Sequence, residues 1–309
     1  SPAELEQRLT PLLEAGHADL HELNLSADEL RLLGFEVADR RVSIPADVER
    51  LSADQVTAAL SERARGWIED LRTLEVVGST NTLIAERLPS NSAHGAVRIA
   101  ELQVQGRGRR GRSWQSPYGQ NLALSLGVQL PLKLEALGGF SLCVGIAAAD
   151  ALQSVGVPDV ALKWPNDVLA RGRKVAGILV EVFSAGSATD VIIGIGINFR
   201  IPPAARQTID QPVIDLDELD GDYSRNQLAG ALISSLVDFA EGFAESGFAP
   251  MRSAFDELHH YHGRSCTLLL GEERLQGTVS GVTPGGELEM VVAGETRVFN
   301  AGEVSLRPG

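Results

Sequence analysis

The stretch from Gln103 to Trp114 has the residue types needed to hold an anion. Four arginines and three glycines occupy positions 106–112 of a 309-residue chain whose formal net charge is −14. Glycine disfavours a helix and the run has no apolar alternation, so we expect a loop. Arginine matches carboxylates and phosphates, and glycine lets a backbone approach a ligand closely. The run therefore indicates an anion clamp, although a solvated basic loop or an RG-type nucleic-acid segment would have the same composition.

Two motifs further along the chain place polar groups where strands are expected. The run from Lys163 to Asp167 (KWPND) brings an ammonium, an amide and a carboxylate together around a rigid proline. A β-rich core tolerates such groups only when they are solvated or used. Lys174 begins an apolar run in which Gly177 leaves room for a ligand or a backbone to approach. A surface turn is the ordinary alternative for the first motif, and a buried strand for the second.

Two shorter motifs are weaker signals when taken alone. Ser79, Thr80 and Asn81 follow an expected strand, and their side chains are suited to capping the next helix. Asn198 ends the glycine-containing run 194–198, where it could bind a ligand or cap a turn. In both cases the local structural role is the simpler interpretation.

The elements that must position these motifs alternate between strands and helices. Strands are expected at 73–77, 96–103, 121–130, 161–169, 173–183 and 190–198. Helices are expected at 4–15, from residue 26, and at 52–71, 81–88, 138–155, 224–246 and 248–261. Residues 201–222 form an acidic stretch without periodicity and are expected to be a loop. Several connections are too short for parallel crossovers, so the sheet is expected to be antiparallel or mixed and the class α+β. No GxGxxG motif opens a helix after a strand, which argues against a Rossmann domain.

The last part of the chain has a different sequence pattern. Short runs at 265–270, 274–282, 288–292 and 297–300 are separated by glycine-rich turns and predict a small β-barrel. The chain is thus expected to contain three units.

The first fifty-five residues suggest a winged helix-turn-helix, with a helix, a second short helix opened by a capping box at Ser26 and Glu29, and two short strands between Phe35 and Pro45. A second full helix able to lie in a major groove is not expected. Residues 1–55 contain five arginines, no lysine and twelve acidic residues, a net charge of −7. A DNA reader normally has the opposite charge, so DNA binding is not expected.

Overall composition narrows the class of partners and the compartment. A pI near 4.9 disfavours non-specific attraction to nucleic acid or anionic lipid. No stretch approaches the length of an apolar membrane span, and Ser1 to Glu6 does not resemble an export signal. Cys143 and Cys266 lack metal-ligand or redox spacing and read as buried thiols. We therefore expect a soluble cytoplasmic protein.

Taken together, the motifs at 79–81, 103–114, 163–168, 174–181 and 194–198 resemble the biotin protein ligases in order and spacing. The resemblance covers about residues 66–309 and includes the closing run 302–307. It implies a degenerate winged-helix-like segment and linker helix at 1–64, a catalytic domain with a mixed sheet at 65–262, and a small SH3-like barrel at 263–309.

The resemblance also implies an activity. Biotin and ATP give biotinyl-5′-adenylate and pyrophosphate, and a lysine of a biotin carboxyl carrier protein, that of acetyl-CoA carboxylase, then takes the biotinyl group. It assigns catalytic roles to Arg109, Lys174 and Asp167; biotin binding to Ser79, Thr80, Asn81, Gln103, Arg107, Gly108, Arg109 and Lys174; and ATP binding to Arg112, Trp114, Lys163, Asn166, Asp167, Asn198 and Arg307. Mg²⁺ is implied with ATP. Asp167 could hold it or help to deprotonate the acceptor lysine, and the sequence does not separate these two roles.

One physical expectation follows for the loop. We expect only a ligand to provide hydrogen-bond partners for the four arginines. The loop should therefore be mobile when empty and should become ordered over the adenylate. A lipoate ligase and a ligase that also represses transcription are the alternatives. The sequence leaves the oligomeric state open, with a homodimer among the options.

Overall fold

The computed structural model describes residues 1–88, 90–207, 209, 211–270, 273–300 and 304–308. Its centre is a seven-stranded sheet in the order β4-β5-β6-β10-β9-β8-β7. The strands are β4 (Asp70–Val77), β5 (Ala96–Gln103), β6 (Asn121–Leu130), β7 (Val160–Lys163), β8 (Asp167–Ala170), β9 (Arg173–Ala185) and β10 (Ala188–Asn198). Strands β4 and β5 are parallel, and the other neighbours are antiparallel. This mixed sheet confirms the predicted α+β class.

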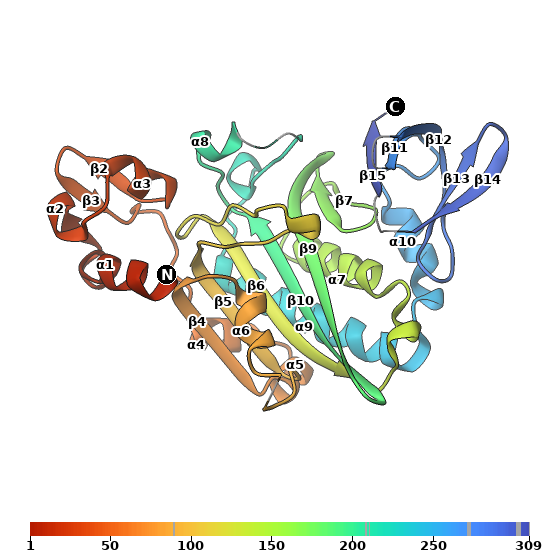
Figure 1. Ribbon diagram of the computed structural model, residues 1–309, viewed down its shortest axis with the longest axis horizontal. Coiled ribbons are helices and arrows are strands. Elements are labelled where there is room, and N and C mark those ends of the chain that lie inside the picture. The colour runs from red at the N-terminus through yellow and green to blue at the C-terminus, as the bar shows by residue number, and fades with distance from the viewer. Residues whose placement is uncertain (89, 208, 210, 271–272, 301–303, 309) are drawn as a thin grey trace.

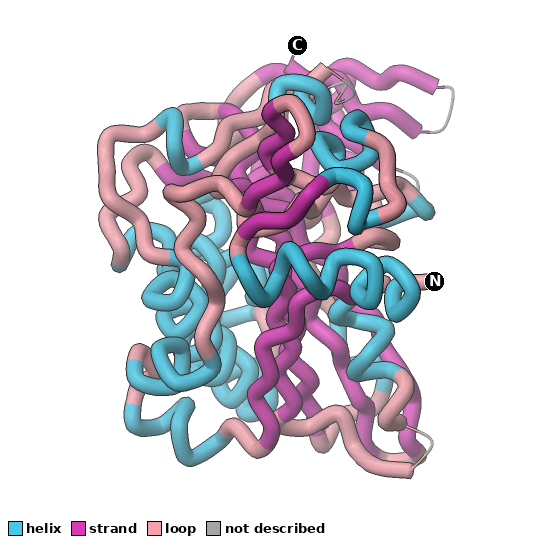
Figure 2. The backbone as a smooth tube through the Cα atoms, turned by 90° about the vertical axis from the view of Figure 1, so that its left-hand side faces the viewer, coloured by secondary structure: helices cyan, strands magenta, loops and turns pink. Residues whose placement is uncertain are grey.

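Helices cover both faces of the sheet. The long helices α7 (Phe140–Ser154) and α9 (Arg225–Ser246) pack on one face, and the short helix α6 (Thr80–Ala85) lies on the other (Figure 1). Figure 2 shows the same layers from the side, with the long helices to the left of the strands. Most of α7 is buried because it packs against α9 as well as the sheet, which explains its apolar sequence.

The predicted strand 161–169 is a hairpin. Strands β7 and β8 pair antiparallel on either side of the turn that contains Pro165, and the Trp164-Pro165 peptide bond is cis. Strand β7 forms the edge of the sheet. Proline cannot donate a ladder hydrogen bond, so the expectation of a break or an edge is confirmed on both counts.

The predicted helix 52–71 is wrong as a single element. The chain forms α4 (Ala53–Ala58) and α5 (Glu62–Trp67), and β4 already begins at Asp70. The Ser61 side chain accepts a hydrogen bond from Ala64 N and caps α5, which stops α4 from continuing. Both helices pack against α9.

The N-terminal segment contains α1 (Pro2–Ala15), β1 (His17–Asp19), α2 (Leu20–Leu23), α3 (Ala27–Leu32), β2 (Glu36–Ala38) and β3 (Arg41–Ser43). Its strands form a sheet in the order β1-β3-β2. The capping box at Ser26 and Glu29 is present, but β1 and α2 were not predicted, because elements of three and four residues have no readable periodicity. The segment shares a core with the central domain, where the rings of Phe35 and Tyr118 lie 5.0 Å apart.

The C-terminal sheet follows α10 (Arg252–Leu258) and comprises β11 (Ser265–Leu270), β12 (Glu273–Val282), β13 (Leu288–Val292), β14 (Glu295–Phe299) and β15 (Val304–Pro308). Its order is β14-β13-β12-β11-β15, with all pairs antiparallel. The four predicted strands are present. Strand β15 overlaps the closing motif 302–307, of which 302 and 303 fall outside the described residues. Within the described residues, no helix is both long and apolar enough to cross a bilayer.

Candidate functional site

One cleft of about 470 Å³ gathers every residue that the sequence predicted for the site. Its lining includes Ser79, Thr80, Asn81, Gln103, Arg107, Gly108, Arg109, Arg112, Trp114, Lys163, Asn166, Asp167, Lys174, Asn198 and Arg307. A volume of this size suits a drug-sized ligand. Residues more than two hundred positions apart in the chain therefore share one cavity.

The topology explains why these motifs meet. Strands β4, β5 and β10 end at the same edge of the sheet, where β9 begins. The β7–β8 turn lies further along β9, where Ile178 N donates to Asn166 O. The strand ends deliver Ser79 from β4, Gln103 from β5 and Asn198 from β10. The chain between β5 and β6 crosses this edge, and its residues 104–116, which we call the arginine loop, border the cleft.

The arginine loop has the outline of a hairpin. Gln103 N donates to Ser116 O, Trp114 N to Gly106 O, and Gly108 N to Arg112 O. At the tip, Arg110 and Gly111 have positive φ angles of 58° and 69°. Left-handed backbone costs a non-glycine residue roughly 1–2 kcal/mol, so the tip is tighter than the glycine content alone suggested.

Two of the arginines already have protein partners. Arg107 Nη2 lies 3.2 Å from Glu181 Oε1 and also contacts Thr82, and Arg109 Nη1 donates to Asn166 Oδ1 at 3.3 Å. The expectation that only a ligand satisfies the four arginines is therefore wrong. It failed because Glu181 and Asn166 come from distant parts of the sequence.

Charge in the cleft is strongly one-sided. Among the described residues, the lining contains eight cationic side chains, Arg107, Arg109, Arg110, Arg112, Lys163, Lys174, Arg200 and Arg307, and a single carboxylate, Asp167. Asp167 Oδ1 lies 2.6 Å from Lys174 Nζ, and its Oδ2 lies 3.7 Å from Lys163 Nζ. A cavity with this lining inside an acidic protein attracts anions locally.

Burial shifts the pKa of two of these cations. It lowers the pKa of Lys163, an effect that outweighs the opposing attraction of Asp167. Burial also lowers the pKa of Arg109 from its ordinary value, and the neighbouring charge of Arg110 adds to the shift. A cation that is shielded from water and lies beside other cations is stabilised more strongly by an incoming anion than a fully solvated cation is.

Glycines make room for the indole of Trp114. A Cβ on Gly196 would come within 2.4 Å of the Trp114 ring, and a Cβ on Gly177 within 3.0 Å. The ring therefore lies flat against β9 and β10, and Lys174 Nζ is 5.5 Å from its centroid. The expected close approach at Gly177 is thus used by this side chain of the protein.

Trp114 also begins a chain of amides. Trp114 Nε1 donates to Asn121 Oδ1, Asn121 Nδ2 to Asn198 Oδ1, and Asn198 Nδ2 to Ile214 O, each at 3.3 Å. Asn121 was not predicted. It stands at the start of β6 with no motif around it, although it is one of the few polar residues at the end of a buried strand.

The residues from 200 to 218, which we call the ion-pair loop, form the far wall of the cleft through Arg200, Ile201, Pro202, Ala205, Ile209, Gln211 and Val213. The sequence predicted an aperiodic stretch here, but it contains α8 (Pro203–Arg206) and a short 3₁₀ turn at Leu216–Glu218. Residues 208 and 210 lie outside the described part.

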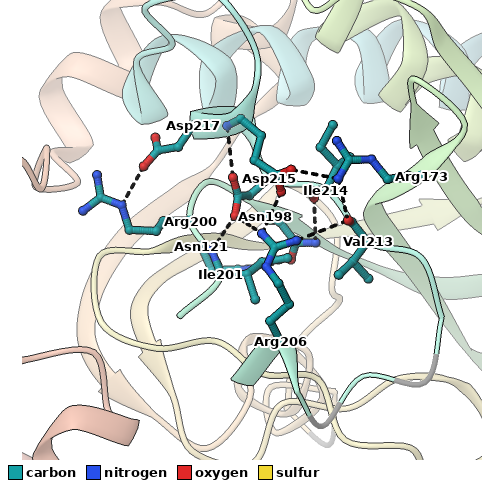
Figure 3. Close-up of polar contacts among 11 residues, drawn as sticks. Asn121, Arg173, Asn198, Arg200, Ile201, Arg206, Val213, Ile214, Asp215 and Asp217 are labelled. Atoms are coloured by element: carbon teal, nitrogen blue, oxygen red, sulfur yellow. Dashed lines mark hydrogen bonds and ion pairs between the residues drawn. The ribbon is translucent and has the colours of Figure 1, made fainter. Parts of the chain in front are cut away.

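Ion pairs hold this loop to the sheet. Arg206 Nη2 lies 2.7 Å from Asp215 Oδ2 (Figure 3). It lies equally close to Glu218 Oε1, and Arg173 Nη1 lies 2.7 Å from Glu218 Oε2. Asp215, whose side chain is 5% exposed, also accepts from Ile201 N. The backbone of Lys174 pairs with this loop at Val213. None of this was visible in the sequence, because each pair joins residues without a motif.

Comparison with known proteins agrees with this arrangement. Residues 73–198 match the biotin/lipoate A/B protein ligase family, and residues 261–307 match the biotin protein ligase C-terminal domain. The chain is 35% identical over 274 residues to the bifunctional ligase/repressor BirA of Escherichia coli K12, covering 88% of this chain and 83% of that protein.

Two further relatives are informative. The biotin–[acetyl-CoA-carboxylase] ligase of Mycobacterium tuberculosis H37Rv is 35% identical over 280 residues, covering 85% of this chain and 97% of that protein. A solved structure of the Aquifex aeolicus biotin protein ligase in complex with biotin and ATP superposes with a TM-score of 0.63 and 28% identity, over 78% of this chain and 99% of that one.

Proposed function

The chain belongs to the biotin protein ligase family, and on that basis we propose that its cleft joins biotin to ATP and delivers the biotinyl group to a carrier lysine. Relatives named biotin–[acetyl-CoA-carboxylase] ligase and a ligase structure holding biotin and ATP identify the enzyme class. The acceptor is proposed to be the biotin carboxyl carrier protein of acetyl-CoA carboxylase.

One observation carries the proposal: in the part of the chain that the structure describes, eight cations and one carboxylate line a single cleft of a strongly acidic protein. In the first step the biotin carboxylate attacks the α-phosphorus of ATP, and the bond to the β-phosphate breaks as pyrophosphate leaves. Two anions must approach one another, and donors fixed in place beforehand lower the cost. A cleft of this charge is what that reaction needs.

We assign Lys174 and Arg109 to the reacting groups. Lys174 Nζ is held 2.6 Å from Asp167 Oδ1 and against Trp114, so its position is fixed without a ligand. Arg109 reaches across the cleft to Asn166 at 3.3 Å. Asp167 has a lysine at each oxygen, and we therefore assign it to orienting Lys174.

The two ends of the cleft suit the two substrates. Ser79, Thr80, Asn81 and Gln103 form a polar end suited to the ureido ring, with Arg107 and Gly108 of the arginine loop above it. Arg112, Trp114, Lys163, Asn166, Asn198 and Arg307 line the part that we assign to ATP. The ion-pair loop adds apolar residues beside Asn198, so we include it at the nucleotide end.

In the second step the neutral amine of the carrier lysine attacks the acyl carbon of biotinyl-adenylate. The bond to the phosphate oxygen breaks, AMP leaves, and the amine loses a proton. The arginine loop would keep water away from the mixed anhydride until the amine arrives.

Mg²⁺ belongs to the proposal only as a companion of ATP. Within the described residues no group of three or more metal-ligating side chains occurs, and Asp167 is already engaged by two lysines. These residues do not fit a magnesium ion held by the protein. The phosphate oxygens of ATP would have to supply its ligands.

Biotin-dependent exchange of labelled pyrophosphate into ATP is the direct test. We expect exchange with biotin and ATP together and none without biotin. Repeating the assay with lipoate in place of biotin shows which of the two acids named in the matched family is the substrate. Exchange supported by lipoate and not by biotin would contradict the proposal.

DNA binding is the second function to consider, because the E. coli relative is named a ligase/repressor. Helix α3, the longer of the pair α2 and α3, has six residues and carries Asp28 and Glu29 in its first turn. Its segment has a net charge of −7. We propose that this chain does not bind DNA specifically, and a gel shift at low salt with the ligase loaded with adenylate would test it.

The remaining parts of the proposal concern organisation. The division into 1–64, 65–262 and 263–309 is supported by the three sheets, each of which falls within one range. A cytoplasmic location fits two free buried cysteines. A homodimer is supported by the edge of β9 beyond Gly177, where Val182 and Phe183 are partly exposed and β8 no longer pairs. Light scattering with and without biotin and ATP would test the dimer.

A further inference from the structure

Two residues outside the predicted set, Ser125 on β6 and Glu181 on β9, join a row of polar contacts behind the cleft wall. Glu181 Oε2 lies 2.7 Å from Asn81 Nδ2, and Asn81 Oδ1 lies 2.5 Å from Ser125 Oγ. Ser125 Oγ in turn lies 2.7 Å from Thr80 Oγ1. Thr80 and Asn81 line the cleft, whereas Ser125 and Glu181 do not.

The carboxylate fixes the direction of the first contact. A carboxylate can only accept hydrogen bonds, so the Asn81 atom facing Glu181 must be the amide nitrogen. The amide oxygen then faces Ser125. The amide nitrogen also faces Leu179 O, at 3.5 Å, and the amide packs closely on Gly194, the residue opposite Ser125 in the β6–β10 ladder, where a Cβ would lie 2.3 Å from Asn81 Oδ1.

The direction continues through the two hydroxyl groups. Ser125 has one hydrogen, and Asn81 Oδ1, which cannot donate, receives it. A hydrogen between the oxygens of Ser125 and Thr80 must then come from Thr80. The other acceptor within reach of the Thr80 hydroxyl is Gln103 Oε1, at 3.1 Å, which also lies in the wall. In either case the Thr80 hydrogen stays within the wall, and its oxygen is left as an acceptor for the cleft.

Because these side chains are buried, water does not compete for their hydrogen bonds or change the direction of donation. Ser125 is 0% exposed, Asn81 3% and Thr80 4%. Each buried polar atom must find its partner within the row, and a reversed row would leave Asn81 presenting an oxygen to the Glu181 carboxylate. Glu181 is the charged end from which the direction is set.

We propose that Glu181 is a positioning residue that acts through Asn81 and Ser125 to make Thr80 an acceptor for a ligand N–H. This inference rests on the proposed function, because the ureido head of biotin carries two N–H groups. It adds to that function the reason why Thr80 accepts from the ligand and does not donate to it.

Glu181 has a second partner that the test must separate. Its carboxylate also pairs with Arg107, at 3.2 Å. Glu181→Gln keeps an oxygen for Asn81 Nδ2 and loses the ion pair with Arg107. Glu181→Leu loses both. The two substitutions therefore distinguish a role in the row from a role in holding the arginine loop.

The experiment measures biotin binding and the kinetics of pyrophosphate exchange for the full-length protein. We expect Glu181→Leu and Ser125→Ala each to raise the KM for biotin about tenfold, the loss from one mispaired buried hydrogen bond, with the KM for ATP and kcat within about twofold of the parent. Glu181→Gln should stay within about threefold. The double variant Glu181→Leu/Ser125→Ala should be no weaker than the weaker single variant by more than about twofold, because both changes break one row.

A matched control is available in Glu289, whose side chain is 24% exposed against 25% for Glu181 and which also pairs with an arginine, Arg252. Glu289→Leu should leave the KM for biotin unchanged. Ser125→Ala keeps the test decisive even if Glu181→Leu does not fold.

Three results would overturn the proposal: a biotin KM for Ser125→Ala within twofold of the parent, effects of Glu181→Leu and Ser125→Ala that multiply in the double variant, or a Glu181→Gln as weak as Glu181→Leu. The last result would assign the effect to Arg107. Absence of biotin-dependent exchange in the parent protein would contradict the proposed function itself. The variants therefore test the role of Glu181 only when the parent protein is active.

Discussion

The cleft is bordered by two loops that use charge in opposite ways. The arginine loop holds its outline with backbone hydrogen bonds between its own two sides, and its four arginines all line the cleft. In the ion-pair loop Arg206, Asp215 and Glu218 pair with one another or with Arg173 and do not line the cleft. The charged side chains of the first loop face the cleft, whereas these three of the second loop hold its backbone.

This difference has a physical basis. Arginines directed at a ligand must keep free donors, so they cannot also be saturated by carboxylates. A loop that contributes mainly apolar contacts to the cleft, through Ile201, Pro202, Ile209 and Val213, has its charged side chains available to fix its shape. Changes in the first loop should therefore alter ligand retention, and changes in the second should alter the position of the nucleotide wall.

The largest effect is expected at Lys174, where the two loops meet. Its ammonium lies over Trp114 of the arginine loop, and its backbone pairs with Val213 of the ion-pair loop. Lys174→Ala should lower the rate of adenylate formation by about 10²–10³, the usual cost of losing one donor to developing charge. Pyrophosphate exchange measures this, and near-normal exchange would remove Lys174 from the reaction. Lys133→Ala, in an exposed connector, is the control.

Arg109 tests the arginine loop as a clamp. Arg109→Gly removes a half-buried cation that reaches Asn166, and the loss of one charge-assisted hydrogen bond should raise the rate of biotinyl-adenylate release about 10- to 100-fold. Free adenylate should then label lysines of unrelated proteins. Rapid filtration of the labelled intermediate measures the release. Retention of the adenylate as tight as in the parent protein would contradict the role of a clamp.

Asp215 tests the second loop. Asp215→Asn breaks the ion pair with Arg206 and leaves a guanidinium without its carboxylate, so the wall beside the nucleotide should loosen. We expect the KM for ATP to rise about tenfold and adenylate release to change little. Asp217→Asn, which removes an exposed carboxylate of the same loop, is the matched control. A rise in adenylate release as large as that in Arg109→Gly would end the distinction between the loops.

Mild acid should tighten the ion-pair loop and leave the arginine loop unchanged. Burial raises the pKa of Asp215 above its ordinary value of 3.8 in spite of Arg206. A raised pKa means that this carboxyl takes up its proton at a higher pH than an ordinary aspartate, and the ion pair with Arg206 is then lost. The same shift means that burying the charge opposes folding at neutral pH, so the global stability contributed by this group rises, and does not fall, on acidification.

Hydrogen exchange followed by mass spectrometry measures this effect. Lowering the pH from about 7 toward 4.5 should raise the protection of residues 201–207 a few-fold after correction for intrinsic rates, while residues 104–116 keep theirs. In Asp215→Asn the pH dependence of the second loop should disappear. Equal change in both loops would show that acid acts on the whole domain, and a loss of protection in residues 201–207 would contradict the direction expected here.

The same contrast explains what the sequence could predict. The arginine loop could be predicted because the residues proposed to bind the ligand cluster in a short motif, and the structure brings all four of its arginines to one cleft. The strands at 96–103 and 121–130 were predicted to the residue because each is a long apolar run with clear ends. The single helix 52–71 was wrong because a serine cap within it carries little signal.

What could not be predicted consists of partnerships between distant residues. Glu181, Asn121 and Asp215 each act through residues that come from other elements, and no local pattern marks them. Only the sheet order brings β6, β9 and β10 together behind the cleft. The sequence therefore predicted the residues that line the cleft and missed residues that hold them in place.

The smallest effect is expected where the ion-pair loop touches the N-terminal segment. Asp47 pairs with Arg200, which also pairs with Asp217, but the Asp47 side chain is 59% exposed. Exposed pairs contribute about 0–1 kcal/mol, so Asp47→Asn should change the KM for ATP by less than about threefold and leave adenylate release unchanged. Steady-state exchange at low and high salt measures this, and the difference from the parent should vanish at high salt. A tenfold effect of Asp47→Asn would mean that the N-terminal segment, and not the pairing of Arg206 with Asp215, sets the position of the nucleotide wall.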